Sequence, residues 1–184
     1  MALRTIEYAQ SMPVSLAKAK AQCRVDAEYE DALIVHYIES ARAYVEGQIR
    51  RSLTPQTFEY TMHGFPPMID LPMPPLKEVL AVRYLDENGD LQELTDYEVY
   101  GIEGRGRIGP KYGESWPATR REPESVRVEF IAGYSFVPPD LKQAMLLLVA
   151  HFHEIRQPAI VGTSVGRVPM SVDALLSPYN VVGF

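Results

Sequence analysis

Residues 140–156 read DLKQAMLLLVAHFHEIR and form the longest dense apolar run in the chain. Pro138 and Pro139 precede this run, and Pro158 follows it. Because proline fits the first turn of a helix but not its interior, these residues mark where a helix starts and stops. At about 100° per residue the apolar side chains cover most of the circumference, as in a buried helix. The sequence therefore predicts a central core helix over 140–156, too short to span a bilayer.

A second long helix is predicted over 28–51, and the core helix is its natural partner. Its apolar residues fall within one arc of about half the circumference: Leu33, Ile34, Tyr37, Ile38, Ala41, Tyr44, Val45 and Ile49. Charged side chains, including Arg42 and Glu46, occupy the opposite side. Two shorter helices are predicted over 15–23 and 171–176.

Between the long helices the apolar period changes from helical to alternating, which is typical of strands. About six short strands are expected, and the alternating runs lie at 56–62, 69–71, 79–85, 91–94, 97–100, 107–108 and 125–134. Asn88-Gly89 between two such runs is a strong hairpin signal, since both residues tolerate positive φ. The sequence therefore predicts an α+β fold, in which an antiparallel sheet over about 55–134 is inserted into a small helical bundle.

The domain organisation follows from this order of elements. We expect one domain over 1–184, with a helical core made of 1–53 and 138–158, a β insertion over 54–137, and a C-terminal tail over 159–184. The tail ends in aromatic and branched residues. Such a terminus is either packed into its own core or docked into a partner, and the sequence leaves both open.

Composition and charge argue against several classes of protein. The net charge of −6 and the pI near 5.3 argue against a dedicated nucleic-acid binder, which is usually basic. A single cysteine, Cys23, excludes an internal disulfide framework and suits a reducing compartment. The first ten residues have no apolar core of the signal-peptide type. We therefore expect a soluble protein made in a cytoplasm, without a membrane partner.

His151, His153 and Glu154 invite a metal-site interpretation, which helical geometry argues against. His151 and His153 point about 160° apart and cannot hold one ion together. His151 and Glu154 share a face, but two ligands do not make a site. We interpret these side chains as polar residues at the end of a core helix and predict no metal, cofactor or catalytic residue. An enzyme or small-ligand protein that uses the His151/Glu154 face stays open as an alternative.

Two glycine-rich stretches match catalytic motifs only in part. Residues 162–166 read GTSVG, the pattern of a hydrolase nucleophile elbow, but that motif needs a helix after the serine and a histidine later in the chain. Gly166 and Pro169 form helix poorly, and no histidine follows Ser164. Residues 104–107 lack the following helix of a phosphate-binding loop. We interpret the first stretch as a glycine-hinged loop and the second as a turn between strands.

The layout of the whole chain resembles a family of phage head–tail connector (adaptor) proteins from long-tailed double-stranded DNA phages, prophages and gene transfer agents. Each matching piece is weak alone, and the specificity lies in their order and spacing. The pieces are PVSLAKAK (13–20), CRVD (23–26), EDALI (30–34), SARAYVE (40–46), LPMPPL (71–76), YLDENG (84–89), SWP (115–117), VEFIAGY (128–134), PPDLKQA (138–144), HFHE (151–154), VGT (161–163) and ALLSPY (174–179). The chain departs from the pattern at 161–167, where Ser164 and Gly166 make the loop more flexible than expected.

The resemblance implies a structural role without chemistry. Proteins of this kind form a closed, dodecameric ring beneath the portal protein of the filled head, in the virion at the head–tail junction, after being made in the bacterial cytoplasm. The ring continues the channel through which double-stranded DNA passes without specific binding, and it offers a surface to a tail-side stopper or tail terminator protein. A net negative charge fits a channel that must not hold phosphates.

The resemblance also implies that the C-terminal segment docks on the portal. Carried onto this chain, it assigns docking to the segment 169–184 and predicts these contact residues: Arg167, Met170, Leu175, Leu176, Tyr179, Val182 and Phe184. Tyr179 and Phe184 would be the anchors, because buried aromatic side chains carry much of an interface's energy. A DNA-packaging accessory stays open as a further alternative, which the negative charge mildly disfavours.

Overall fold

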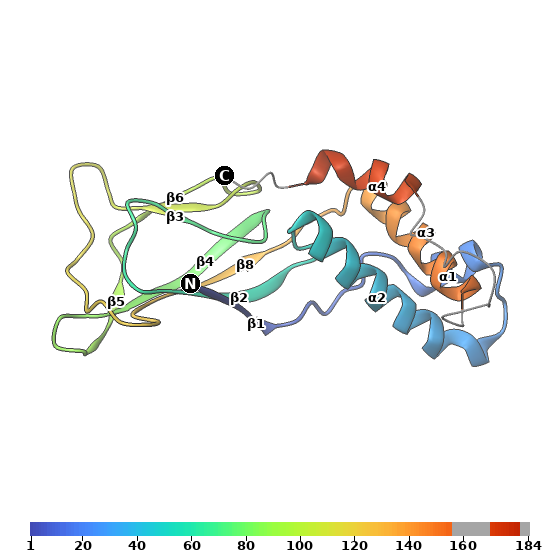
Figure 1. Ribbon diagram of the computed structural model, residues 1–184, viewed down its shortest axis with the longest axis horizontal. Coiled ribbons are helices and arrows are strands. Elements are labelled where there is room, and N and C mark those ends of the chain that lie inside the picture. Colours follow the sequence, from blue (N-terminus) through green and yellow to red (C-terminus); the bar gives the residue numbers. More distant parts are fainter. Residues whose placement is uncertain (156–169, 181–184) are drawn as a thin grey trace, which may run out of the picture. The chain divides into compact units, whose positions relative to one another are not determined.

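The computed structural model describes residues 1–155 and 170–180, which form two compact units (Figure 1). A sheet unit consists of 1–10 and 54–135, and a helical unit consists of 11–53 and the chain from 136 onward. The helical unit is thus assembled from segments on both sides of the sheet unit in sequence. The predicted α+β class is confirmed, with helices before and after a run of antiparallel strands.

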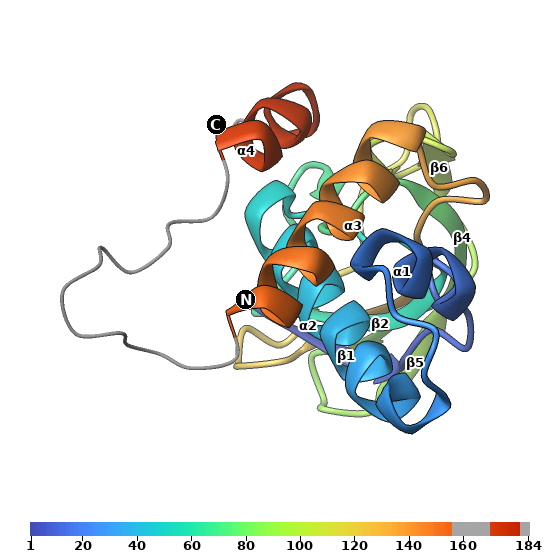
Figure 2. The ribbon, with the colours of Figure 1, turned by 90° about the vertical axis from the view of Figure 1, so that its right-hand side faces the viewer.

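The helical unit is built around α3 (Pro139–Glu154), the predicted core helix. It contacts α1 (Leu16–Cys23), α2 (Asp31–Ile49) and α4 (Met170–Leu176), as Figure 2 shows. The buried side chains of α3 are Leu141, Ala144, Met145, Leu148 and Val149, and those of α2 are Ile34, Ile38, Ala41, Val45 and Ile49. Among the described residues, no helix is long and apolar enough to cross a membrane.

Local signals explain where these helices begin and end. Ser15 caps α1, because its hydroxyl accepts a hydrogen bond from the backbone N–H of Lys18. Pro138 and Pro139 start α3 as predicted. The predicted helix over 28–51 is shorter than expected, since Glu28–Glu30 forms a 3-10 turn (η1) before α2 begins.

The larger sheet has five strands in the order β1-β2-β8-β4-β5, and all neighbours are antiparallel. Its strands are β1 (Ala2–Glu7), β2 (Gln56–Met62), β8 (Val126–Ala132), β4 (Leu76–Leu85) and β5 (Leu91–Leu94). β1 was not predicted. It joins the edge of the sheet, although helices α1 and α2 separate it from β2 in sequence.

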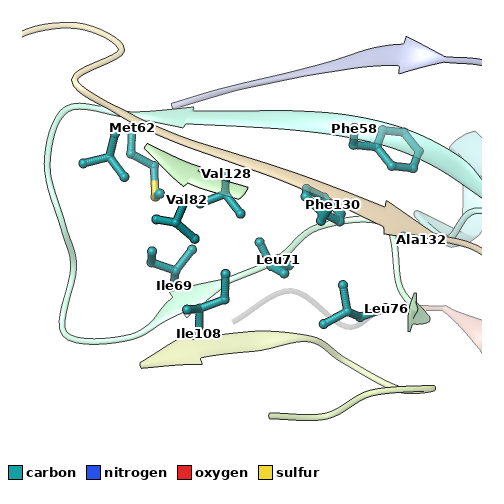
Figure 3. Packing of buried hydrophobic residues seen from close by; sticks show 11 residues of the cluster. Phe58, Met62, Ile69, Leu71, Leu76, Val82, Ile108, Val128, Phe130 and Ala132 are labelled. Atoms are coloured by element: carbon teal, nitrogen blue, oxygen red, sulfur yellow. The ribbon is translucent and has the colours of Figure 1, made fainter. Parts of the chain in front are cut away.

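A smaller sheet has three antiparallel strands in the order β3-β7-β6, where one sheet was predicted. These are β3 (Ile69–Asp70), β7 (Arg107–Gly109) and β6 (Glu98–Tyr100). Figure 3 shows Ile69 and Ile108 of this sheet directed toward Met62, Val82 and Val128 of the larger one. The core of the sheet unit therefore lies between two sheets.

The predicted hairpin is β4–β5, with Asn88-Gly89 in its turn. Five residues, 86–90, connect the strands, and only Gly89 has a positive φ, at 93°. The Asp86 carboxylate accepts hydrogen bonds from the backbone N–H groups of Asn88 and Asp90. These bonds and that from Gln92 lower the pKa of Asp86, the bond from Asp90 having the largest effect.

Gly133 supports a prediction about stability, because no side chain fits there. Its φ is +140°, and a Cβ on it would lie 2.3 Å from the backbone carbonyl of Thr54. Gly133→Ala should therefore lower the free energy of unfolding by several kcal/mol, since strained backbone and overpacking each cost about 1–3 kcal/mol. Chemical denaturation would measure the change.

Gly47 provides the matched control. It lies inside α2, and a Cβ on it would meet no atom within 4 Å. Gly47→Ala should raise the free energy of unfolding by about 0.5–1 kcal/mol, because alanine is the better helix former. Equal effects of the two substitutions would contradict the assignment of Gly133 as a site of close backbone approach.

Candidate docking segment

Residues 170–180 of the C-terminal segment that the sequence singles out pack onto their own helical unit. α4 contacts α3 and α2, and its side chains Val172 and Leu176 are buried. Burial of a valine or leucine side chain stabilises a fold by about 1.5–3 kcal/mol. Residues 170–180 thus pack on their own helical unit, whereas the terminal residues 181–184, for which the two alternatives were left open, lie outside the described residues.

Two hydrogen bonds hold the 3-10 turn η2 (Ser177–Tyr179) that follows α4. Arg51 Nε donates to the backbone carbonyl of Tyr179 at 2.8 Å. The Tyr179 hydroxyl donates to Asp140 Oδ2 at 3.4 Å, and Asp140 lies in the first turn of α3. The turn is therefore fixed to residues just beyond the end of α2 and at the start of α3.

The predicted docking residues do not all face the same way. Met170 is 87 % exposed, Leu175 and Tyr179 are half-buried, and Leu176 is buried. The first three therefore retain surface that a partner could contact, whereas Leu176 anchors the segment to its own chain. Arg167, Val182 and Phe184 lie outside the described residues, as does the glycine-hinged stretch 162–166.

The two histidines of α3, His151 and His153, contact other side chains of the helical unit. His153 Nε2 lies 3.0 Å from Glu30 Oε2, and both side chains are largely buried. The ring of His153 also contacts Tyr37 edge-on, and His151 lies beside Phe152. Within residues 1–155 and 170–180, no three His, Cys, Asp or Glu side chains lie together as a metal site would require. The arrangement ties η1 to the end of α3.

A shallow hollow of about 300 Å³ lies between α2 and α3. It is lined by His36, Tyr37, Ser40, Phe152 and Ile155. The sequence pattern does not predict this hollow, because the hollow depends on how the two helices meet.

Cys23 lies near the Glu30 end of this unit and has a raised pKa. Burial of the thiol is the main cause, and the negative charges of Glu154 and Glu30 add to it. A thiol that is reluctant to ionise is a poor nucleophile. The cysteine therefore has the character of a structural residue.

The raised pKa predicts the pH dependence of Cys23 alkylation. Because the thiolate is the reactive form, the rate with iodoacetamide should rise through a midpoint above the ordinary thiol value. Glu154→Gln removes a negative charge and should move that midpoint to lower pH. Alkylation quenched at a series of times and pH values, followed by mass spectrometry, would measure the midpoint for the parent protein and for the variant. A midpoint below the ordinary thiol value in the parent protein would contradict the raised pKa of Cys23.

The packing of Leu176 gives a second test in this region. Leu176→Ala should loosen α4, because truncating a buried leucine costs about 2–5 kcal/mol. Deuterium uptake by the amides of 170–180 should then rise at least tenfold in rate. Met170→Ala, in the same helix but exposed, should leave uptake unchanged. Equal protection in both variants would show that Leu176 does not hold the segment.

Comparison with known proteins relates this fold to particle necks. Residues 13–85 match the family model of phage gp6-like head–tail connector proteins. A chain of the virion of a native gene transfer agent (GTA) particle is 24 % identical, with a TM-score of 0.81, covering 100 % of this chain and 97 % of that one. No curated protein matches the chain.

Two further solved structures share the fold over the same extents, 100 % of this chain and 97 % of theirs. A chain from the neck of an empty GTA particle, computed with C6 symmetry, is 24 % identical with a TM-score of 0.77. A chain from the neck of a native GTA particle, computed with C12 symmetry, is 25 % identical with a TM-score of 0.74. The family match runs from Pro13 to Leu85 and so includes parts of both units. Residues 13–85 are thus similar to the phage gp6-like head–tail connector family, and the whole chain shares the fold of these gene transfer agent chains.

Proposed function

We propose that the protein forms a closed ring at the head–tail junction of a phage-like particle and joins the head to the tail there. The observation that carries this proposal is the match of the whole chain to neck chains of gene transfer agent particles, together with the connector family match over 13–85. A connector works as a structural protein. Its function requires surfaces for partners and no reacting group.

A ring is supported by the symmetry of the related necks. One of them was computed with C12 symmetry and another with C6 symmetry. We infer a dodecamer, in which each copy presents two different surfaces to its two neighbours, as any cyclic assembly larger than a dimer does. Such a ring would continue the DNA channel below the portal.

Docking on the portal is the second part of the proposal. We assign it to the exposed side of the docking segment, where Met170, Leu175 and Tyr179 keep accessible surface. Arg167, Val182 and Phe184 extend the same segment in sequence. Leu176 contributes indirectly, because its burial fixes the segment on α3. The opposite side of the ring would receive a tail-side stopper or tail terminator protein.

The charge of the two units supports passage of DNA without binding. The sheet unit carries nine Lys and Arg residues against fifteen Asp and Glu residues, which accounts for the whole net charge of −6. The helical unit is neutral, with nine of each. Non-specific affinity for DNA comes from cations on phosphates. A surface with excess carboxylates therefore lets the duplex slide past.

The native mass of the protein, alone and mixed with the cognate portal ring, tests the connector function. The mixture should contain one complex of a defined number of copies on one portal. A protein that stays monomeric and ignores the portal would contradict the proposal. A mobility shift with double-stranded DNA at physiological salt should be negative; tight DNA binding would favour the packaging-accessory alternative instead.

Portal docking needs variants that spare the helical core. Deleting the whole segment would remove the buried Val172 and Leu176, so smaller changes are better. Met170→Asp and removal of residues 181–184 should each weaken portal binding at least tenfold. Tyr112→Ser, at a fully exposed position in the sheet unit, is the control and should bind the portal normally. Unchanged binding by both docking variants would place the portal contact elsewhere.

A further inference from the structure

Strand β1 forms an open edge of the larger sheet. It pairs with β2 on one side, and none of the described strands pairs with its other side. Its residues are exposed except for the half-buried Thr5, and the exposed ones include Leu3 and Ile6. A free strand edge presents backbone N–H and C=O groups that can pair with another chain, and an apolar one usually has to be covered.

The opposite edge of the same sheet is β5, which is also open. Among the strands that the structure describes, β5 pairs with β4 alone, and Leu91 at its start is exposed. The two edges differ in length and sequence, so they form two unlike surfaces on one unit. A cyclic ring needs one such pair of unlike surfaces per copy, because each surface meets the other kind on the neighbouring copy.

One row of side chains crosses all five strands of the sheet and ends at its two open edges. The strand registers align Leu94, Val82, Val128, Tyr60 and Leu3 in that order. All five side chains are apolar or aromatic, and the inner ones belong to the core of the unit or pack against it. Leu3 and Leu94 end the row at the two edges. Joining β1 of one copy to β5 of the next would continue the apolar row across the boundary.

The charges of the two edges differ. The segment 86–98, which contains β5, carries six carboxylates and no cation. Strand β1 carries one cation, Arg4, and one carboxylate, Glu7, at its end. The register places Arg4 and Glu93 on the same face of the sheet, two positions apart, on either side of the Leu3–Leu94 row. Arg4 also pairs with Glu59 of β2 at 2.8 Å, and its side chain is 71 % exposed. A cation beside a carboxylate at the boundary would favour this pairing over like-edge pairing.

The strand pairing of the larger sheet is also irregular. The register shifts between Thr5 and Glu7 in β1, and twice along β4. Such bulges bend strands and increase twist. A bent sheet can meet a rotated neighbour edge to edge, which a ring requires.

We propose that β1 of one copy adds to the β5 edge of the next copy, so that the ring closes through its sheets. This inference rests on the ring of the proposed function and adds which surfaces form it. The partner is a second copy of the same chain. Backbone hydrogen bonds supply affinity, while the Leu3–Leu94 row and the Arg4–Glu93 pair select the unlike edge.

A photo-crosslinker placed at Ile6 tests the proposal in assembled particles or portal complexes. After irradiation, mass spectrometry should find the β1 peptide joined to a peptide of 86–98 from a neighbouring copy. A cross-link to another part of the chain, or to a different protein, would overturn the edge pairing while leaving the connector function intact. Absence of the protein from the assembly would instead count against the connector function.

A charge placed at the edge gives an independent test. Ile6→Lys should raise the concentration needed for ring formation at least tenfold, because a lysine on an edge strand opposes pairing. Leu80→Lys is the matched control, since Leu80 is in the same sheet and is 43 % exposed, against 44 % for Ile6. Thermal unfolding of each monomer would verify folding. Equal effects of the two folded variants on ring formation would overturn the proposal.

Discussion

Burial of α3 is the interaction on which the helical unit depends. Its side chains Leu141, Met145 and Leu148 are fully buried, and the helix contacts all three other helices of that unit. Each such side chain contributes about 1.5–3 kcal/mol, so the sum is comparable to the whole stability of a small domain. Because α1 and α2 precede the longer segment of the sheet unit, 54–135, and α3 follows it, this burial also brings together segments that the sheet separates in sequence. Folding of the helical unit is therefore non-local.

The periodic elements were predictable because their burial is regular. α2 and α3 bury apolar side chains at helical spacing, and the burial of β8 alternates, so period alone identifies these elements. β1 was not predicted, because its residues are exposed on both faces and leave no alternating pattern of burial. The division into two sheets was also missed, since strand pairing depends on contacts such as Leu76 with Gly104, which sequence periodicity does not report.

The sequence proposes the candidate docking site as a segment and does not say which of its side chains are exposed. A short apolar helix such as α4 does not reveal which side faces its own core, and the structure turns Leu176 inward and Met170 outward. The hydrogen bond from Arg51 to Tyr179 joins residues 128 positions apart, so no local sequence pattern predicts it. The same limit applies to Glu46 within a helix. The sequence pattern places it on the charged face, but its side chain is largely buried. It accepts a hydrogen bond from the backbone N–H of Leu53 and forms an ion pair with Arg42.

The fully exposed apolar residues fit a protein that works between partners. Tyr29, Tyr112, Phe136 and Met170 are each at least 86 % exposed, and they lie in a turn, in loops and at the start of a short helix. Single exposed residues of this kind are common on monomers and form no patch by themselves. Here they occur in both units, as does the connector family match. The exposed apolar surface of the described residues is therefore spread over both units, which fits contacts on several surfaces better than binding at one confined site.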